Sequence, residues 1–224
     1  MNLPEIKLIS FDICPYVQKS VILLEFKKIP FKTIYIDIFN KPDWFLMKSP
    51  TGKVPLLEID SKHIIFESTV INEYLNEVTN ANLLPSESIE RAKHRSYIEY
   101  SNLVLISLFQ FMTATNELDY LKHEDILFKE LTNIESISTE SFFNTKDLNL
   151  VDIAFAPIFI RLKMLKEKFQ INFLEDFPKV VKWSEKILSQ DAVIKSIDDE
   201  LFSKYCLYLQ KRNAKIFHDL KVCR

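Results

Sequence analysis

The sequence predicts a two-domain chain, with an α/β domain built on a mixed β-sheet at the N-terminus and an all-α domain after it. Strand-like and helix-like hydrophobic patterns alternate through residues 1–79, a polar segment with a proline follows at 80–92, and only helical patterns are seen over 93–224. A chain of 224 residues with 47% hydrophobic side chains has enough apolar surface for two cores. We therefore expect residues 80–92 to link two separately packed domains.

The first half of the N-terminal domain has the pattern of a strand, a helix and a second strand. Residues 5–11 form a short β-rich run, residues 13–29 carry apolar side chains at helical spacing, and residues 31–38 alternate as a strand does. A strand that returns to the same sheet through a helix runs parallel to the first. These residues therefore predict a βαβ unit with two parallel strands.

The second half of that domain has the pattern of two strands and a helix. Residues 55–60 and 63–66 are short strand-like runs, and Ser61 and Lys62 between them form a connection of the length of a tight hairpin turn. Residues 67–78 then place apolar side chains on one helical face. Because a hairpin pairs its strands antiparallel, the complete sheet is predicted to be mixed, in the order βαβ and then ββα.

The C-terminal domain shows no convincing strand-like alternation. Its apolar residues recur at helical spacing in five segments, 91–118, 123–138, 147–169, 177–190 and 196–214. Residues 147–169 form the most apolar of these segments and are expected to be the most buried helix. The sequence therefore predicts an all-helical domain over 93–224.

Charge and hydropathy argue against two classes of partner. Lys and Arg number 29 against 31 Asp and Glu, so the net charge of −2 supplies no field that would hold a nucleic acid or an anionic membrane. No apolar run approaches the roughly 20 residues of a membrane span, and the first residues lack a basic leader followed by an apolar stretch. We therefore expect a cytoplasmic protein without nucleic-acid or membrane partners.

The cysteines and histidines do not form a metal-binding pattern. Cys14, Cys206 and Cys223 make an odd number without close pairs, which fits neither a disulfide framework nor a zinc site. The four histidines are scattered, and there is no paired CxxC, no HExxH and no glycine-rich phosphate loop. We therefore expect no bound metal, and thiols that stay reduced.

Cys14 and Pro15 lie at the predicted junction of the first strand and the first helix. Proline is favoured in the first helical turn, so Cys14 would face the N–H groups and the positive dipole end that stabilise a thiolate and lower the thiol pKa. Taken alone, Cys-Pro fits better a small buried hydrophobe, the commoner role of such a cysteine. Val17 stands where a CxxC motif has its second cysteine, so a reactive Cys14 would need an external thiol to complete a redox cycle.

Pro55 is the first residue of a predicted strand. A proline has no N–H to donate to the sheet, so it is tolerated only in edge strands, at the first residue of a strand or at bulges. An X-Pro bond is the one peptide bond for which the cis form is readily accessible, and a cis Pro55 would leave the backbone of Val54 open to an extended peptide ligand. A simple turn proline is an equally good interpretation. Gly52, the only glycine, stands just before, where a positive φ or a close ligand would require it; other positive-φ turns are then expected to use Asn or Asp.

Glu67 and Ser68 open the helix predicted over 67–78. By local rules a serine here is simply an N-cap, and that is the better interpretation of the single residue. A hydroxyl together with helix N–H groups also binds a carboxylate, and a neighbouring acidic side chain binds an ammonium. The head group of an amino acid needs that combination.

Together, the segments CPYV (14–17), KVP (53–55) and IIFES (64–68) resemble the glutathione transferases, and the order of elements resembles their thioredoxin-like domain. The stretch from NKPDWF to LLP looks closest to the omega class and its cysteine-bearing bacterial relatives. The resemblance is strong over the N-terminal domain and weaker over the helices, where NLVDIAFAP carries it. In that segment Asn149 and Asp152 match the capping box of the family's central helix, which is a structural feature.

The resemblance implies roles for three residues around the sulfur of glutathione. Cys14 would be the catalytic residue and would form a mixed disulfide with glutathione, while Tyr16 at the mouth of the site would contribute its backbone more than its ring. The Val54 backbone would pair with the cysteinyl unit of the tripeptide. Pro55 would be cis.

The resemblance also implies residues for the two charged ends of glutathione. Glu67 and Ser68 would hold the γ-glutamyl ammonium and carboxylate. Lys41 matches the lysine that meets the glycyl carboxylate. Lys53 joins the same carboxylate in related classes, although other omega-like members have an apolar residue there, so its role stays open.

The activity implied is that of a glutathione-dependent thiol transferase, working by thiol-disulfide exchange. Dehydroascorbate, glutathionyl adducts and small disulfides would be its substrates, conjugation would be weak, glutathione would be the co-substrate, and the chain would form a homodimer. The alternative is a non-catalytic binding protein of the same fold, as in the stringent-starvation proteins that bind RNA polymerase. Those proteins lack the reactive cysteine, which this chain keeps as Cys14.

Overall fold

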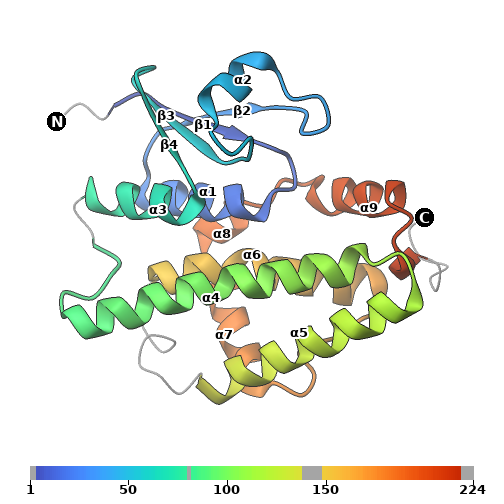
Figure 1. The fold of residues 1–224 in the computed structure, drawn as a ribbon. Helices are drawn as coiled ribbons and strands as arrows, with labels where there is room; N and C mark the ends of the chain where they lie inside the picture. The colour runs from blue at the N-terminus through green and yellow to red at the C-terminus, as the bar shows by residue number, and fades with distance from the viewer. Residues whose placement is uncertain (1–3, 80–81, 138–147, 218–224) are drawn as a thin grey trace. The chain divides into compact units, whose positions relative to one another are not determined.

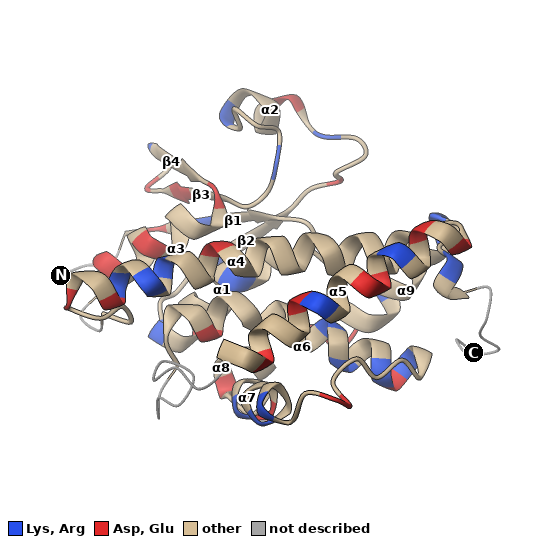
Figure 2. Cartoon of the chain, turned by 60° about the horizontal axis from the view of Figure 1, so that its bottom comes forward, with Lys and Arg blue, Asp and Glu red and all other residues tan. Residues whose placement is uncertain are grey.

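Figure 1 shows the fold as a computed structural model, which describes residues 4–79, 82–137 and 148–217. The chain forms two compact units. The first runs up to Leu83 and also takes in Asp191–Ile197, and the second takes Leu84–Gln190 and the residues from Asp198 onward. Figure 2 shows that basic and acidic residues occur together along the helices.

The first unit is built on a four-stranded mixed sheet with the strand order β2-β1-β3-β4. Strand β1 (Ile6–Ser10) runs parallel to β2 (Lys32–Tyr35), and the helix α1 (Pro15–Lys27) connects them. Strand β3 (Leu56–Ile59) runs antiparallel both to β1 and to β4 (His63–Phe66). The predicted order of βαβ and then ββα is thereby confirmed.

The inner strands β1 and β3 carry the apolar core of this sheet. Strand β3 is buried at every position, whereas the outer strands β2 and β4 are exposed or half-buried. A buried cluster of Ile9, Ile36, Phe45 and Leu56 packs on one face. Burial of an Ile, Leu or Phe side chain is worth about 1.5–3 kcal/mol each, so this cluster is a main source of the unit's stability.

Helix α3 (Ser68–Glu77) packs against α1, and a buried hydrogen bond joins the two helices. The hydroxyl of Ser20 donates to the Asn72 side-chain oxygen at 2.8 Å. A buried polar pair of this kind fixes the rotation of each helix, because a slip would leave both groups without a partner.

The short helix α8 (Asp191–Lys195) belongs to the first unit although it lies far along the chain. It packs against α1, and the side-chain amide of Gln18 donates to the Ser196 carbonyl oxygen at 3.2 Å. Nothing in the local sequence of 191–197 indicates this placement, because it depends on a contact with residues more than 170 positions earlier.

Positive φ angles occur at more residue types than expected. The six non-glycine cases in the described ranges are Lys28, Asp60, Ser61, Glu67, Gln170 and Asn213. The expectation that Asn or Asp would serve these turns is therefore wrong for four of them. Lys28 and Gln170 are helix C-caps, where hydrogen bonds to the last carbonyl groups offset the roughly 1–2 kcal/mol that this conformation costs.

The second unit is helical in all its described elements, as predicted. It consists of α4 (Ser88–Thr113), α5 (Glu117–Ile137), α6 (Leu150–Phe169), α7 (Pro178–Leu188), α9 (Leu201–Lys211) and a 3-10 turn (Lys215–Phe217). Helix α6 is buried along most of its length and forms the centre of this unit. Across the described ranges, the search for membrane-spanning helices finds none of sufficient length and apolarity.

Asn149 and Asp152 form a capping box at the start of α6. The Asn149 side chain accepts the N–H groups of Val151 and Asp152 at 2.8 and 3.1 Å, and Asp152 accepts the Asn149 N–H at 3.0 Å. The fully buried Asp152 carboxylate also accepts the Trp183 indole N–H at 2.7 Å and lies 3.4 Å from the Lys186 ammonium. Burial raises the pKa of Asp152, although these donors act against it. The box therefore ties α7 to α6.

Asp152→Ala is expected to lower the free energy of unfolding by about 3 kcal/mol, because it removes a buried acceptor shared by the N–H groups of Asn149, Trp183 and Lys186. Asn149→Ala is expected to cost about 1 kcal/mol, the usual effect of losing an N-cap. Urea unfolding followed by circular dichroism measures both values. Equal losses for the two variants would contradict the tie between α6 and α7, and Glu167→Gln on the exposed side of α6 serves as the control.

Candidate functional site

Cys14 occupies the N-cap position of α1, in an extended conformation with φ −70° and ψ 117°, and Pro15 is the first helical residue. The Cys14 N–H donates to the Phe11 carbonyl oxygen at 3.0 Å, and the first helical hydrogen bond runs from the Gln18 N–H to the Cys14 carbonyl oxygen at 3.1 Å. The N–H groups before Gln18 in the first turn, those of Tyr16 and Val17, have no partner within the helix, so they and the dipole favour negative charge at Cys14. The thiol is half-buried and outside any disulfide.

Tyr16 lies within electrostatic range of both Cys14 and Glu67. Burial raises the pKa of the Tyr16 phenol most, and the negative charges of Cys14 and Glu67 raise it further. The ammonium of Lys19, which is buried, lies 5.5 Å from the centre of the Tyr16 ring. The phenol therefore stays protonated at neutral pH, so that it can donate a hydrogen bond but cannot act as a base.

Val54 and Pro55 precede β3, and the peptide bond between them is cis. Pro55 is buried and Val54 is half-buried. The pairing of β3 with its neighbours begins at Leu56, so the N–H and C=O of Val54 lie outside the ladder of the sheet. Backbone groups outside a sheet ladder are of the kind that can pair with an extended peptide.

The loop before this proline is held by the buried Ser49. Its hydroxyl lies 3.2 Å from both the N–H and the carbonyl oxygen of Lys53, and the Gly52 N–H donates to the Ser49 carbonyl oxygen at 3.2 Å. Gly52 has a φ of 62°, which explains the glycine. A Cβ added there would lie 3.8 Å from the Lys41 ammonium, so the exposed Lys41 reaches over this loop.

Glu67 has a φ of 67° and a ψ of 119°, a strained conformation for a residue with a side chain. Strain of this kind costs about 1–3 kcal/mol and gathers at functional sites. Glu67 is the exposed N-cap of α3, and Ser68 after it is buried in the first helical turn. Because the chain bends at Glu67, α3 begins only two residues after the last residue of β4.

The topology of the sheet brings these segments to one end. Ile9 near the end of β1 pairs with Leu56 at the start of β3, and Leu56 pairs in turn with Phe66 at the end of β4. The residues that follow β1, precede β3 and follow β4 must therefore meet at the same sheet end. Cys14, Val54 and Glu67 lie in those three segments. The segment that leads to Lys41 also starts there, because β2 runs parallel to β1.

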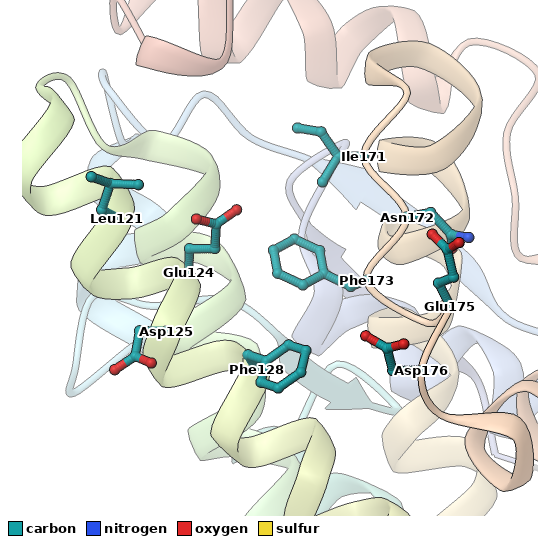
Figure 3. Close-up of a pocket in the computed structure, with 9 residues that line it drawn as sticks. All are labelled: Leu121, Glu124, Asp125, Phe128, Ile171, Asn172, Phe173, Glu175 and Asp176. Atoms are coloured by element: carbon teal, nitrogen blue, oxygen red, sulfur yellow. The ribbon is translucent and has the colours of Figure 1, made fainter.

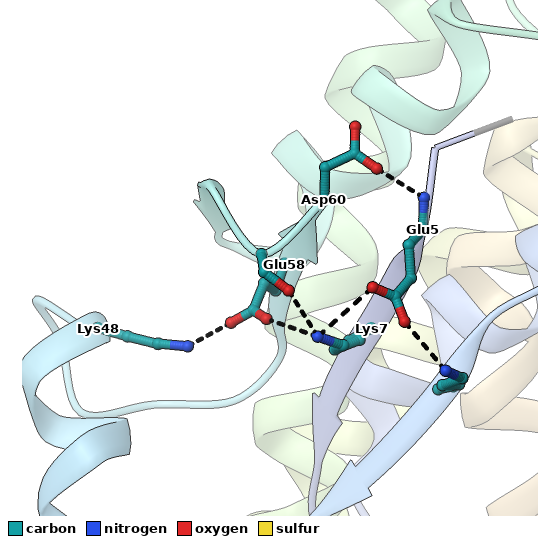
Figure 4. Close-up of polar contacts among 7 residues, drawn as sticks. Glu5, Lys7, Lys48, Glu58 and Asp60 are labelled. Atoms are coloured by element: carbon teal, nitrogen blue, oxygen red, sulfur yellow. Dashed lines mark hydrogen bonds and ion pairs between the residues drawn. The ribbon is translucent and has the colours of Figure 1, made fainter. Parts of the chain in front are cut away.

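A cluster of ion pairs on the sheet holds α2 (Asp43–Lys48), which follows Lys41 (Figure 4). The buried Glu58 of β3 forms an ion pair with Lys48 at the end of α2 and another with Lys7 of β1 at 3.2 Å. The hydrogen bond from Lys48 is the main cause that lowers the pKa of Glu58. Sequence reasoning missed this cluster, although a glutamate in the otherwise apolar run LLEI was a signal for it.

The described residues contain no group of three or more His, Cys, Asp or Glu side chains that would hold a metal ion. The described cysteines, Cys14 and Cys206, are both half-buried thiols. Cys223 lies outside the described residues.

Comparison with known proteins gives matches to two family models. Residues 13–78 match "Glutathione S-transferase, N-terminal domain" and residues 89–191 match "Glutathione S-transferase, C-terminal domain". Glutathione S-transferase omega-1 from Sus scrofa is 30% identical over 219 residues, which cover 96% of this chain and 85% of that protein.

Solved structures of glutathione transferases have the same fold. The omega 3C enzyme from Trametes versicolor matches with a TM-score of 0.76 and 24% identity, over 87% of this chain and 90% of that one. Rice GST1, solved in complex with glutathione, matches with a TM-score of 0.81 and 20% identity, over 94% and 99% of the two chains.

Glu58→Gln is expected to lower the free energy of unfolding at pH 7 by about 2 kcal/mol, because it removes the charge that pairs two ammonium groups. Folding lowers the pKa of Glu58, so its carboxylate stabilises the folded state at pH values above the ordinary pKa of 4.5. This stabilisation is lost as the pH falls through the folded-state pKa. The difference between wild type and variant should therefore shrink below pH 4.5. Urea unfolding at several pH values measures it, with the exposed Glu77→Gln as control. A difference that is the same at acidic and neutral pH would contradict the role of the charge.

Proposed function

The chain belongs to the glutathione S-transferase family, and from this premise we propose that it is an omega-like thiol transferase with Cys14 as its nucleophile. The coarser function, a glutathione-dependent transferase, comes from its omega-class relatives. The observation that carries the finer proposal is the place of Cys14 at the N-cap of α1, at the sheet end where the loops after β1 and β4 and before β3 meet.

Glutathione would bind along this sheet end as an extended peptide. The Val54 N–H and C=O would pair with its cysteinyl unit, which brings the glutathione sulfur toward Cys14. The Ser68 hydroxyl and the N–H groups at the start of α3 suit the γ-glutamyl carboxylate, and Glu67 suits the ammonium. Lys41 and Lys53 on the other side suit the glycyl carboxylate, and the backbone of Tyr16 lies at the mouth.

The reaction proposed is thiol-disulfide exchange in two steps. The Cys14 thiolate attacks the glutathionyl sulfur of a mixed disulfide, the old S–S bond breaks, and the substrate leaves as a thiolate that takes a proton from water. The thiolate of a second glutathione then attacks the sulfur bound to Cys14, which releases oxidised glutathione and restores the Cys14 thiolate. In net, one free glutathione thiol is consumed, the mixed disulfide is reduced to the substrate thiol, and oxidised glutathione is released. Val17 in place of a second cysteine requires the external thiol.

Small disulfides, glutathionyl adducts and dehydroascorbate are the proposed substrates, with conjugation to electrophiles as a weak side activity. A cysteine at the position of Cys14 forms a covalent bond with the glutathione sulfur. Conjugation instead needs a group that only stabilises the glutathione thiolate, which must stay free to attack the electrophile. We further propose that the chain acts in the cytoplasm as a homodimer, without nucleic-acid or membrane partners.

Cys14→Ser is expected to lower glutathione-dependent reduction of hydroxyethyl disulfide by at least about 100-fold, because a serine hydroxyl forms no mixed disulfide. The rate is followed through oxidised glutathione with a coupled reductase, and mass spectrometry should find one added glutathione on the wild type and none on the variant. Cys206→Ser, which removes the other described half-buried thiol, is the matched control and should keep its rate. If Cys14→Ser reduces the disulfide at the wild-type rate, Cys14 is not the nucleophile.

Glu67→Gln and Ser68→Ala are each expected to raise the KM for glutathione about tenfold with a smaller change in kcat, because they remove charge-assisted bonds to the γ-glutamyl head group. Retention on immobilised glutathione provides a second measurement. Lys62→Gln, in the hairpin turn at the opposite end of β3, serves as the control variant. If the wild type neither binds the resin nor reduces the disulfide, the binding-module alternative is favoured.

A further inference from the structure

A cavity of about 400 Å³ lies within the second unit, between α5 and the segment that joins α6 to α7 (Figure 3). Helix α5 supplies Leu121, Glu124, Asp125 and Phe128, whose spacing places them on one helical face. The cavity has no lining residue in common with the candidate site around Cys14. Its volume falls within the range of about 300–1,000 Å³ that is usual for small-molecule sites.

The opposite wall is the loop over residues 171–176, whose course is set by backbone hydrogen bonds. Gln170, the C-cap of α6, has the left-handed conformation, and the Ile171 N–H then donates to the Leu165 carbonyl oxygen at 3.2 Å. At the other end the Phe177 N–H donates to the Leu174 carbonyl oxygen at 3.1 Å. Because both ends are held, the loop forms a defined wall.

Two aromatic rings line the cavity, and each also packs against a further aromatic ring. The buried Phe173 meets Phe111 edge to face with the ring centres 4.9 Å apart. Phe128 lies 5.1 Å from Phe177. Figure 3 shows Phe173 and Phe128 between the two walls. The rings offer an apolar surface that also attracts cations.

The charged groups of the lining are all acidic. Glu124 and Asp125 come from α5, Glu175 and Asp176 come from the loop, and no lysine, arginine or histidine is among the nine lining residues. Asp125 already forms an ion pair with Lys129 at 2.6 Å, and both side chains are exposed, so Glu124, Glu175 and Asp176 are the carboxylates on which a cation site would depend. Burial raises the pKa of the half-buried Glu124, and the nearby Glu117 raises it further.

We propose that this cavity binds a small organic cation, an ammonium group carried on an aromatic or alkyl body. The carboxylates of the two walls match the ammonium, and the rings of Phe128 and Phe173 match the body. The same carboxylates repel anions, so glutathione itself is not the ligand of this cavity. The described carboxylates do not gather closely enough to form a metal site.

The test is a titration of the full chain with three probes of one shape, followed by two-dimensional NMR. The probes are 2-phenylethylamine, the neutral 2-phenylethanol and the anionic 3-phenylpropionate. We expect saturable binding of the amine, at least about tenfold tighter than that of the alcohol, with the largest shifts at α5 and the loop. Equal binding of the amine and the alcohol, or an amine titration that does not saturate, would overturn the proposal.

Charge-removing variants localise the site. Glu124→Gln and Asp176→Asn should each weaken amine binding about tenfold without changing the response to the alcohol. Glu167→Gln removes the same charge from an exposed position of α6 outside the cavity, and it should bind the amine as the wild type does. Thermal unfolding checks that all three variants are folded. If the Glu124 and Glu167 variants bind the amine with equal affinity, the cavity is not the binding site.

Discussion

The pairing of β3 with β1 on one side and with β4 on the other is the constraint on which the candidate site depends. Because Leu56 pairs with both Ile9 and Phe66, the chain leaves β1, enters β3 and leaves β4 at the same end of the sheet. A shift of one residue in either register would turn the buried faces outward and separate these segments, so the core and the site are set by the same contacts.

One buried carboxylate secures each unit, and the two differ in their surroundings. Glu58 lies between two lysine ammonium groups, which lower its pKa and join α2 to the sheet. Asp152 receives mainly neutral N–H donors and is fully buried, so the cost of burial prevails and its pKa rises. The sign of each shift thus follows from the charge of the partners set against burial.

Sequence reasoning succeeded where the signal is local. Pro15 marked the start of α1, Ser61 and Lys62 marked the hairpin turn, and the Asn149 capping box marked the start of α6. It missed features that need distant partners. The Lys48–Glu58 pair joins a helix to a strand, and the strained φ of Glu67 is imposed where β4 meets α3. The roles of Cys14, Val54, Glu67 and the other site residues, the exposed Lys41 and Lys53 included, stay predictions.

By itself, the sequence determined the alternation of strands and helices and the helical nature of the second unit, and it led to the proposal of Cys14 as the reactive group. These follow from hydrophobic period and from residues next to one another in the chain. Only the tertiary structure decided that Cys14, Val54 and Glu67 lie in segments that meet at the same end of the sheet. It also decided that α8 joins the first unit and that carboxylates from two segments line one cavity. Those arrangements depend on strand register and packing between distant residues, which no local pattern encodes.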